Sequence, residues 1–340
     1  MARHVRRLVG PLAPLAGAGL LLAALAAAPA ARAGAAPRAA PAGGPWLFSY
    51  FVDDGQDGLH LAYSRDGLAW TPLREGRPFL APTVGGKLMR DPSVVLGPDG
   101  VFHMVWTTGL WEQGIGVGHS RDLLAWSGVE FLPVMVHERQ AVNAWAPEII
   151  WDEETRQYVI FWATSIPGRF PDTDESADSR SSDGARLNHR IYRTTTRDFR
   201  EYTRAELFFD PGFAVIDAAI VRDGAQYVMV FKNATRFPEA TEDIRIAFAD
   251  HALGPYRVEP GPISKANRVE GPTAFRAGGE LMVLYDAYTR RRFEGVRSRD
   301  LKAWAALGAD LTMPAGARHG TVFAVPEKVL AGLLAAPLAR

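Results

Sequence analysis

The chain has 340 residues, of which 47% are hydrophobic and 22% charged, and its 38 basic side chains balance 38 acidic ones. This composition is typical of a globular protein, and the lack of a basic excess argues against nucleic acid as a partner. Because the chain contains no cysteine, disulfide bonds and thiolate chemistry are excluded.

The N-terminal segment differs in composition from the rest. Three arginines precede a Leu/Ala-rich apolar run, and Ala31-Arg32-Ala33 follows it. This order is typical of a secretory signal peptide, which we assign to residues 1–33, although an uncleaved membrane anchor fits the same run. Residues 34–45, rich in Ala, Pro and Gly, are expected to form a linker. We therefore expect a secreted protein, extracellular or periplasmic, with no membrane association after cleavage.

A short turn motif recurs along the rest of the chain. In each copy an Asp follows a Ser, a Thr or a small residue and leads to an aromatic residue. The copies centre on Asp66, Asp122, Asp198, Asp250 and Asp300, in steps of 56, 76, 52 and 50 residues. Such a period corresponds to one four-stranded sheet with its turns, so it predicts a β-propeller. Because Asp side chains bind backbone amides two residues further on, we interpret the motif as structural.

Each later repeat also contains a short apolar segment that follows a turn signal, as the second strand of a hairpin does. These segments are residues 102–106, 158–162, 227–231 and 281–285. A strand at 318–323 has no repeat after it, and we expect it to pair with the N-terminal strands within 46–73. The chain is therefore predicted to be all-β, a five-bladed propeller over 46–326 whose ring is closed by joining its two ends. A helix is predicted at 327–338, within a C-terminal tail of residues 327–340.

Four repeats open on a carboxylate within an otherwise apolar segment, namely Asp91, Glu148, Asp217 and Glu270. A buried carboxylate is unfavourable unless it is paired or hydrogen-bonded, and a single one would be interpreted as a structural acid. Four at matching points of a propeller would gather like charges at the axis, and their repulsion would raise the pKa of at least one. Hydrolysis of a glycosidic bond requires this combination of a protonated acid and an ionised base.

The order of these motifs carries a resemblance. Along residues 46–326 the chain presents Arg90-Asp91-Pro92, Trp145-Ala146-Pro147-Glu148, Ile216-Asp217, Glu270-Gly271-Pro272 and Arg318-His319-Gly320. This set resembles glycoside hydrolase family 43, the five-bladed propellers of arabinan, xylan and galactan breakdown. The resemblance implies that Asp91 is the general base and Glu270 the general acid. It implies that Asp217 is the acid that tunes pKa values in the site and orients the substrate.

The resemblance also implies roles for residues around these acids. Arg90, Trp145, Glu148 and Arg318 are expected to bind substrate. His319 is expected at the propeller axis, where relatives often hold a calcium ion through water molecules, whereas the chemistry itself is expected to need no cofactor. Glu148 stands where many family members have Asp, so it is interpreted either as a substrate contact or as a structural axis residue. The chain also departs from the family at Asn233, where an acidic residue is common.

Two further features bear on substrate contact. Residues 170–188 contain few apolar residues and form either a mobile surface loop or a loop that shapes the cleft. Among the aromatic residues Trp106, Trp145, Trp162 and Tyr288, only Trp145 is expected to contact a sugar, because inward-facing Trp in a sheet is usually core.

Together these features predict a secreted glycosidase that acts on plant or microbial polysaccharide or oligosaccharide by single-step inversion. Arabinofuranoside is the first expected substrate, followed by galactoside or xyloside. Two alternatives stay open. The Ser-x-Asp turns are similar to the Asp boxes of sialidases, which use a Tyr nucleophile and an Arg triad. A propeller of this kind could also bind carbohydrate without hydrolysing it.

Overall fold

The computed structural model describes residues 44–176, 179–180, 186–237 and 239–337. The predicted signal peptide and most of the predicted linker lie outside these residues. Within the described part, no helix has both the length and the apolar character needed to cross a membrane.

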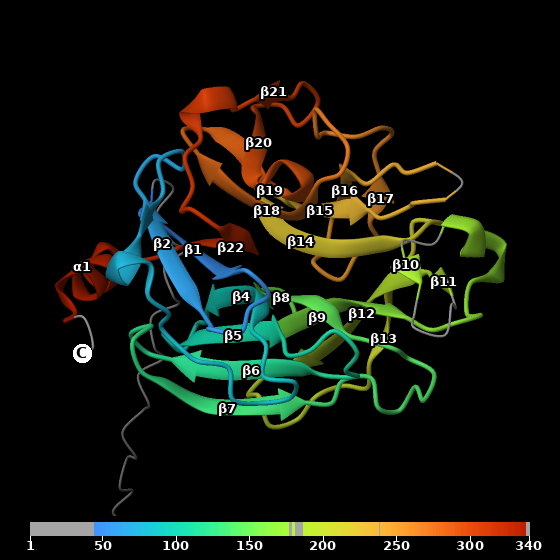
Figure 1. Ribbon diagram of the computed structural model, residues 1–340, viewed down its shortest axis with the longest axis horizontal. Coiled ribbons are helices and arrows are strands. Elements are labelled where there is room, and N and C mark those ends of the chain that lie inside the picture. The colour runs from blue at the N-terminus through green and yellow to red at the C-terminus, as the bar shows by residue number, and fades with distance from the viewer. Residues whose placement is uncertain (1–43, 177–178, 181–185, 238, 338–340) are drawn as a thin grey trace, which may run out of the picture. The chain divides into compact units, whose positions relative to one another are not determined.

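Five four-stranded antiparallel sheets form the blades of a β-propeller, as predicted (Figure 1). From the axis outward, blade 1 contains β22 (Ala317–Ala324), β1 (Trp46–Val52), β2 (His60–Ser64) and β3 (Thr71–Pro72). Blade 2 contains β4 (Arg90–Leu96), β5 (Phe102–Thr107), β6 (Ile115–Ser120) and β7 (Trp126–Leu132). Blade 3 contains β8 (Trp145–Asp152), β9 (Gln157–Ser165), β12 (His189–Thr196) and β13 (Glu206–Phe209).

Blade 4 contains β14 (Val215–Asp223), β15 (Gln226–Asn233), β16 (Asp243–Ala249) and β17 (Arg257–Val258). Blade 5 contains β18 (Glu270–Ala277), β19 (Glu280–Ala287), β20 (Arg292–Ser298) and β21 (Ala305–Ala306). A small hairpin of β10 (Ser179–Arg180) and β11 (Arg186–Leu187) lies between β9 and β12 in the chain. Short 3₁₀ turns are η1 (Leu73–Gly76), η2 (Pro171–Ser176), η3 (Tyr288–Arg290) and η4 (Gly308–Asp310). The four segments predicted as second strands lie in β5, β9, β15 and β19.

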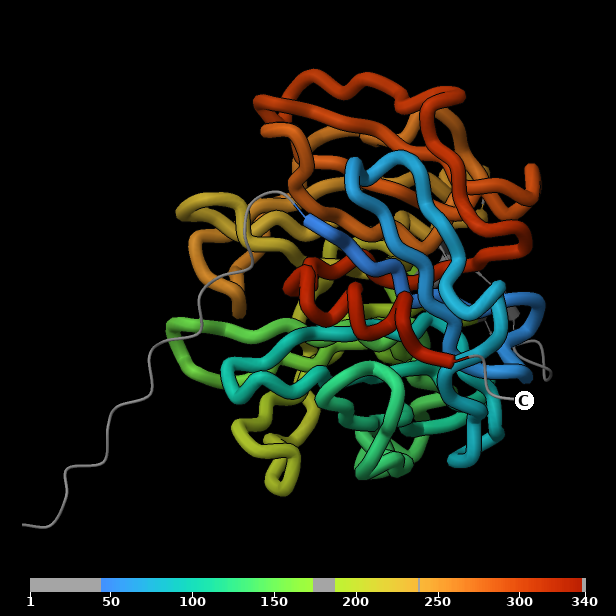
Figure 2. The backbone as a smooth tube through the Cα atoms, turned by 90° about the vertical axis from the view of Figure 1, so that its left-hand side faces the viewer, coloured from blue at the N-terminus to red at the C-terminus, as the bar shows by residue number. Residues whose placement is uncertain are grey.

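The two ends of the propeller meet in blade 1. The last strand, β22, pairs antiparallel with the first, β1, with Trp46 opposite Ala324 and Tyr50 opposite Gly320. This pairing confirms the predicted ring closure. The helix α1 (Glu327–Ala335) follows directly, three residues shorter than predicted. It lies beside the N-terminal strands (Figure 2), with Leu330 and Leu333 in the core between blades 1 and 2.

The hydrophobic core is divided into five clusters, and each lies between two neighbouring blades. Between blades 5 and 1, for example, the rings of Phe48 and Phe293 meet edge to face at 5.4 Å. Trp106 and Trp162 are fully buried in two of the other clusters, as predicted for core residues. Because every blade packs against two others, the inner strands are held side by side around the axis.

The repeated turns join the third and fourth strands of the blades. In blade 1, Asp66 Oδ1 accepts hydrogen bonds from the backbone N–H groups of Leu68 and Ala69, both at 2.8 Å, and these bonds hold its pKa below the usual range. Equivalent pairs of bonds are made by Asp122, Asp198 and Asp300. The structural interpretation of the motif is confirmed in these four turns.

Candidate active site

The inner strands share an irregularity at the point where each begins. In all five, two residues on the inner strand lie opposite one residue on its neighbour, which defines a β-bulge. In blades 2 to 5 one residue of the bulge has a positive φ: Asp91 at 53°, Ala146 at 45°, Asp217 at 53° and Gly271 at 58°. Bulges of this kind re-aim side chains and are frequent next to active sites.

The bulges correct the prediction that the four acids occupy matching points. Asp91 and Asp217 occupy the positive-φ position, whereas Glu270 precedes it by one residue and Glu148 follows it by two. In blade 5 the position must be glycine, because a Cβ on Gly271 would lie 2.4 Å from Cγ of His319. Similar places in the sequence repeats therefore did not mean the same place in the bulge.

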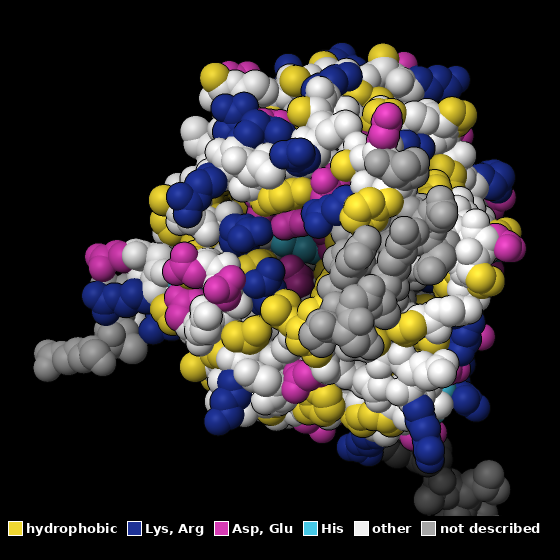
Figure 3. Space-filling view, turned by 45° about the vertical axis from the view of Figure 1, so that its right-hand side comes forward, with side chains coloured by type: hydrophobic (Ala, Val, Ile, Leu, Met, Phe, Trp, Pro, Cys, Tyr) yellow, Lys and Arg dark blue, Asp and Glu magenta, His cyan; other side chains and the backbone are white. Residues whose placement is uncertain are grey.

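The structure brings Asp91, Asp217 and Glu270 together in one pocket of about 160 Å³. The rest of the lining consists of Phe51, Arg90, Thr107, Leu110, Trp145, Ala146, Ile216 and His319. In Figure 3 a hollow is rimmed by Lys and Arg side chains, with histidine and carboxylate atoms at its floor. Arg90, Trp145 and His319 thus line the pocket together with the three acids.

His319 links two of the three acids. Its Nδ1 lies 3.1 Å from Asp91 Oδ1 and 4.0 Å from Asp217 Oδ1. Burial opposes a charge on His319, but Asp217 and Asp91 outweigh that effect and raise its pKa to about 9. Burial likewise opposes ionisation of Asp91, yet the hydrogen bond and charge of His319, together with Arg90, hold the pKa of Asp91 below its usual range. Asp91 is therefore a carboxylate at neutral pH.

Asp217 has the opposite electrostatic character. Burial raises its pKa to about 6, and the charge of Glu270 adds to this effect, while His319 opposes it. Its Oδ2 accepts the backbone N–H of Gly271 at 3.0 Å. This bond ties Asp217 to the backbone immediately after Glu270, so the two acids are held as one unit.

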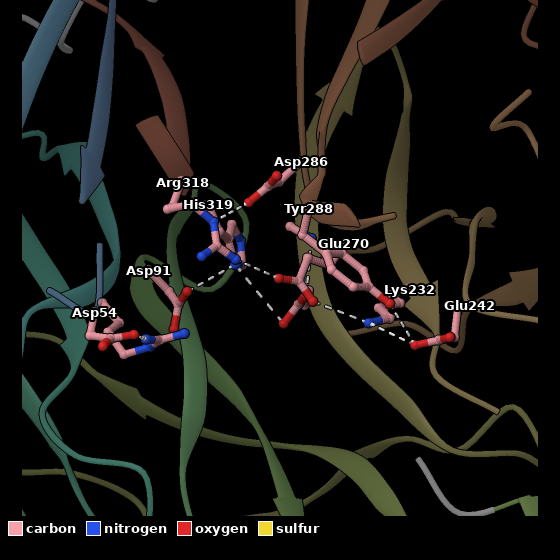
Figure 4. A network of polar contacts seen from close by, with 12 residues as sticks. Asp54, Asp91, Lys232, Glu242, Glu270, Asp286, Tyr288, Arg318 and His319 are labelled. Atoms are coloured by element: carbon pink, nitrogen blue, oxygen red, sulfur yellow. Dashed lines mark hydrogen bonds and ion pairs between the residues drawn. The ribbon is translucent and has the colours of Figure 1, made fainter. Parts of the chain in front are cut away.

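Two cations hold Glu270 from two sides (Figure 4). Lys232 Nζ donates to Oε2 at 3.2 Å, and Arg318 Nη2 donates to Oε1 at 3.1 Å. Arg318 also donates to the buried Asp286 at 2.6 Å. Lys232 is buried, and the charges of Glu270 and Asp217 outweigh that burial and raise its pKa to about 12. Arg318 therefore contacts the predicted general acid, although it is not among the residues that line the pocket.

Lys232 belongs to a second group of polar contacts behind the pocket. Its Nζ lies 5.2 Å from the ring centre of Tyr288 and 3.9 Å from Glu242 Oε1. The same Glu242 oxygen accepts hydrogen bonds from Tyr288 at 2.8 Å and Arg236 at 2.9 Å. Lys232 is thereby fixed by groups that do not themselves line the pocket.

Glu148 lies outside the pocket lining, so its prediction as a substrate contact is not supported. It is buried at the axis, where it accepts hydrogen bonds from Ser93 Oγ at 2.6 Å and Thr321 Oγ1 at 2.5 Å. Burial raises its pKa to about 7, although both hydrogen bonds oppose the shift. Of the two interpretations of Glu148, the position favours the structural one, a bridge between β4, β8 and β22.

A buried carboxyl with a raised pKa makes stability depend on pH. Glu148 contributes full stability below its ordinary pKa of 4.5, and the contribution is lost as the pH rises through about 7. Glu148→Gln cannot ionise, so we expect the variant to be more stable than the parent at pH 8 by roughly 3 kcal/mol, with little difference at pH 4. Urea unfolding at the two pH values measures this. An equal effect at both would contradict a buried, ionising Glu148.

The aromatic residues at the pocket have separate functions. Trp145 lines the pocket, stacks on His189 with ring centres 4.7 Å apart, and donates its indole N–H to Leu110 O at 2.6 Å. Next to it Trp111 is 55% exposed, with its ring centre 5.7 Å from that of Trp145. The pair forms an aromatic surface that begins in the pocket and continues to its rim. Tyr288 contacts Lys232 instead of lining the pocket.

Several residues of the site carry no signal in the sequence. Phe51 packs under the guanidinium of Arg90 at 4.8 Å, and Thr107 Oγ1 donates to Asp91 Oδ2 at 2.8 Å. Phe51 and Thr107 stand at the ends of β1 and β5, and Lys232 near the end of β15. The last residues of the second strands pair with the bulged starts of the first strands, so these residues become site candidates only once the strand pairing is known. Asn233, noted as a departure, accepts the N–H of Thr235 in a local turn.

The surroundings of His319 do not fit a directly bound metal ion. Within the described residues, no group of three or more His, Cys, Asp or Glu side chains is arranged to hold one. A histidine whose pKa is raised to about 9 is protonated at neutral pH, and a metal ligand must be deprotonated. The geometry favours a charged His319 that pairs with Asp91 and Asp217.

The described pocket residues also bear on the sialidase alternative. The lining contains one arginine, Arg90, and no tyrosine. A sialidase needs a Tyr nucleophile.

Of the predicted loop at residues 170–188, the structure describes residues 170–176, 179–180 and 186–188.

Comparison with known proteins agrees with the geometry. The model of a family described as a probable glycosyl hydrolase domain, related to glycoside hydrolase family 43, matches residues 44–330. The chain belongs to this family. Membership confirms both the resemblance carried by the ordered motifs and the predicted class of enzyme, a glycosidase.

Named relatives of this family-43-related domain are distant. An α-L-arabinofuranosidase of Bifidobacterium longum subsp. longum is 25% identical over 162 residues, which is 43% of this chain and 15% of that protein. The crystal structure of an α-L-arabinofuranosidase from Lactobacillus brevis matches with 15% identity and a TM-score of 0.51, over 67% of this chain and 73% of that one. The catalytic domain of a GH62 α-L-arabinofuranosidase from Coprinopsis cinerea matches with 16% identity and a TM-score of 0.49, over 72% and 76%. The Lactobacillus match shows a shared fold, and the Bifidobacterium match spans a small part of the relative.

Proposed function

We propose that this chain is an inverting glycosidase that removes single terminal sugars, with Asp91 as general base and Glu270 as general acid. The observation that carries the proposal is the meeting of three acids in different electrostatic surroundings within one small pocket. Asp91 is kept ionised by His319, Asp217 has a raised pKa, and Glu270 is held by two cations.

The size of the pocket supports action on a terminal sugar. A cavity of about 150 Å³ accommodates one benzene-sized ring. The present pocket, at about 160 Å³, is therefore suited to one sugar ring and not to several consecutive units. Trp145 provides an apolar wall for the ring, and the exposed Trp111 continues this wall toward the rest of the saccharide.

In the proposed reaction, Asp91 removes a proton from the water that attacks the anomeric carbon. Glu270 donates a proton to the leaving oxygen, and the bond between that oxygen and the anomeric carbon breaks. Lys232 and Arg318 fix both oxygens of Glu270, which orients the carboxyl group toward the leaving oxygen. Asp217 holds the backbone after Glu270 through the N–H of Gly271. No metal ion or other cofactor takes part in these steps.

Arabinofuranoside is the first proposed substrate, followed by xyloside and galactoside. The Bifidobacterium relative bears the name α-L-arabinofuranosidase, and a pentose ring suits the volume of the pocket. We also propose that the protein is exported, on the evidence of the sequence of residues 1–33. A secreted mature protein whose mass corresponds to a start near Gly34 would support cleavage.

A panel of aryl glycosides tests the proposed activity. We expect release of the aryl group from at least one pentoside by the wild-type protein, and much slower release by Glu270→Gln from a phenyl pentoside, whose leaving oxygen is basic. Proton NMR of the first anomer released tests the mechanism, since initial inversion is expected. Initial retention would contradict Asp91 as base. If no glycoside and no polysaccharide is cleaved while sugar binding persists, the protein is a carbohydrate-binding propeller instead.

A further inference from the structure

A second cavity, of about 800 Å³, lies on blade 5 beside the candidate active site. The ends of β19 and β20, the hairpin that joins them and the segment that leads into β22 form its walls. The lining includes the apolar residues Phe293, Leu311, Met313 and Pro314. Its volume lies within the range of small-molecule sites in proteins.

The lining of this cavity also carries an excess of basic side chains. Four basic side chains, Lys265, Arg290, Arg291 and Arg292, line it together with a single acidic one, Glu294. Glu294 is already shared by two guanidinium groups, because it accepts hydrogen bonds from Arg290 at 2.9 and 3.2 Å and from Arg292 at 2.8 and 3.0 Å.

The remaining two cations are available to a ligand. Lys265 and Arg291 are exposed, and neither forms an ion pair with any residue in the described part of the chain. A positive charge that is left over in a concave, partly apolar surface attracts an anionic ligand. The arginine fork matches the planar geometry of a carboxylate.

The cavity and the active site share two strands. Tyr285 lines the cavity, and the next residue, Asp286, accepts the hydrogen bond from Arg318. Ala317 lines the cavity as well, and Arg318 after it donates to Glu270. In both strands, a residue that lines the cavity is therefore followed directly by one that belongs to the contacts of Glu270.

We propose that this cavity binds the carboxylate of a uronic acid carried by the saccharide whose terminal sugar occupies the active site. The basic side chains pair with the carboxylate, and the apolar residues pack against the sugar ring. The proposal extends the proposed function, since it assigns an acidic saccharide as the preferred substrate. Lys265 and Arg291 are the residues that determine this preference.

Calorimetric titration with two matched ligands tests the proposal. The first is an oligosaccharide that contains uronic acid, and the second is the same oligosaccharide with each carboxyl group reduced to an alcohol. We expect the wild-type protein to bind the acidic ligand more tightly, with an affinity that falls as salt is added. The double variant Lys265→Gln/Arg291→Gln is expected to bind the acidic ligand about tenfold more weakly and the reduced ligand as before.

A matched control removes the same charge elsewhere. Arg121→Gln/Lys302→Gln changes two exposed side chains of the repeated turns, neither of which lines the cavity, and is expected to bind like the wild type. Equal affinity of the wild type for both ligands, equal losses in the two double variants, or tighter binding of a sulfated than of a carboxylated ligand would overturn the proposal. Binding can be measured without turnover. The carboxylate site can therefore be supported even if the protein hydrolyses no glycoside. An active enzyme that shows no preference for the acidic ligand would refute the carboxylate site and leave the proposed glycosidase activity intact.

Discussion

Asp91→Asn is expected to lower kcat on a pentoside by about 10²- to 10⁴-fold, the size of effect typical of general acid–base catalysis. Asn has nearly the shape of Asp and can still accept the hydrogen bond from Thr107, which measures 2.8 Å in the parent. It cannot take a proton from water. We therefore expect kcat to fall while KM changes little, as measured by steady-state kinetics of aryl group release.

A matched acid in the same blade provides the control for Asp91. Asp122 lies in the turn between β6 and β7, where its Oδ1 accepts the N–H groups of Leu124 and Ala125. Asp122→Asn should therefore cost about 1 kcal/mol of stability and leave kcat unchanged. A loss of kcat in Asp122→Asn as large as in Asp91→Asn would show that Asp91 acts through stability, and would remove it from the proposed chemistry.

The fold was largely predictable because its signals are local. Turn residues such as Asp66 act through backbone amides two and three positions away, so their recurrence marks every blade except the fourth with the same bonding pattern. Ring closure followed from counting, since the strand at Arg318 had no repeat after it. The bulges were not predictable, because Asp91, Ala146 and Gly271 differ in side chain and share only a backbone conformation.

The site was predictable to the extent that its residues lie on the first strand of each blade. Asp91, Asp217 and Glu270 stand out because a carboxylate interrupts an apolar segment. Lys232 does not stand out in the sequence, because its partners are far along the chain: Glu270 lies in another blade, and Tyr288 follows β19. Glu148 shows the converse, since it interrupts an apolar segment as clearly as Asp91 but points to the axis, where Ser93 and Thr321 bind it.

Glu270→Gln is expected to have an effect that depends on the leaving group. A general acid matters most when the leaving oxygen is basic, as in a natural saccharide, and least when it is already a stable anion, as in a dinitrophenyl glycoside. We expect kcat on the saccharide to fall by about 10³-fold and kcat on the dinitrophenyl glycoside to fall much less. Comparing kcat across a series of aryl leaving groups of different basicity measures this dependence.

The loss of a charge at Glu270 also disturbs its cations, and Glu242 allows the two effects to be separated. Both carboxylates lie beside Lys232, Glu270 at 3.2 Å and Glu242 at 3.9 Å, but only Glu270 lines the pocket. Glu242→Gln should weaken the contacts of Lys232 while the acid remains, so its kcat should change by a similar factor for every leaving group. Glu270→Gln should change the slope of the series. If plots of kcat against leaving-group basicity have the same slope for both variants, Glu270 only positions the site, and the proton must come from another group.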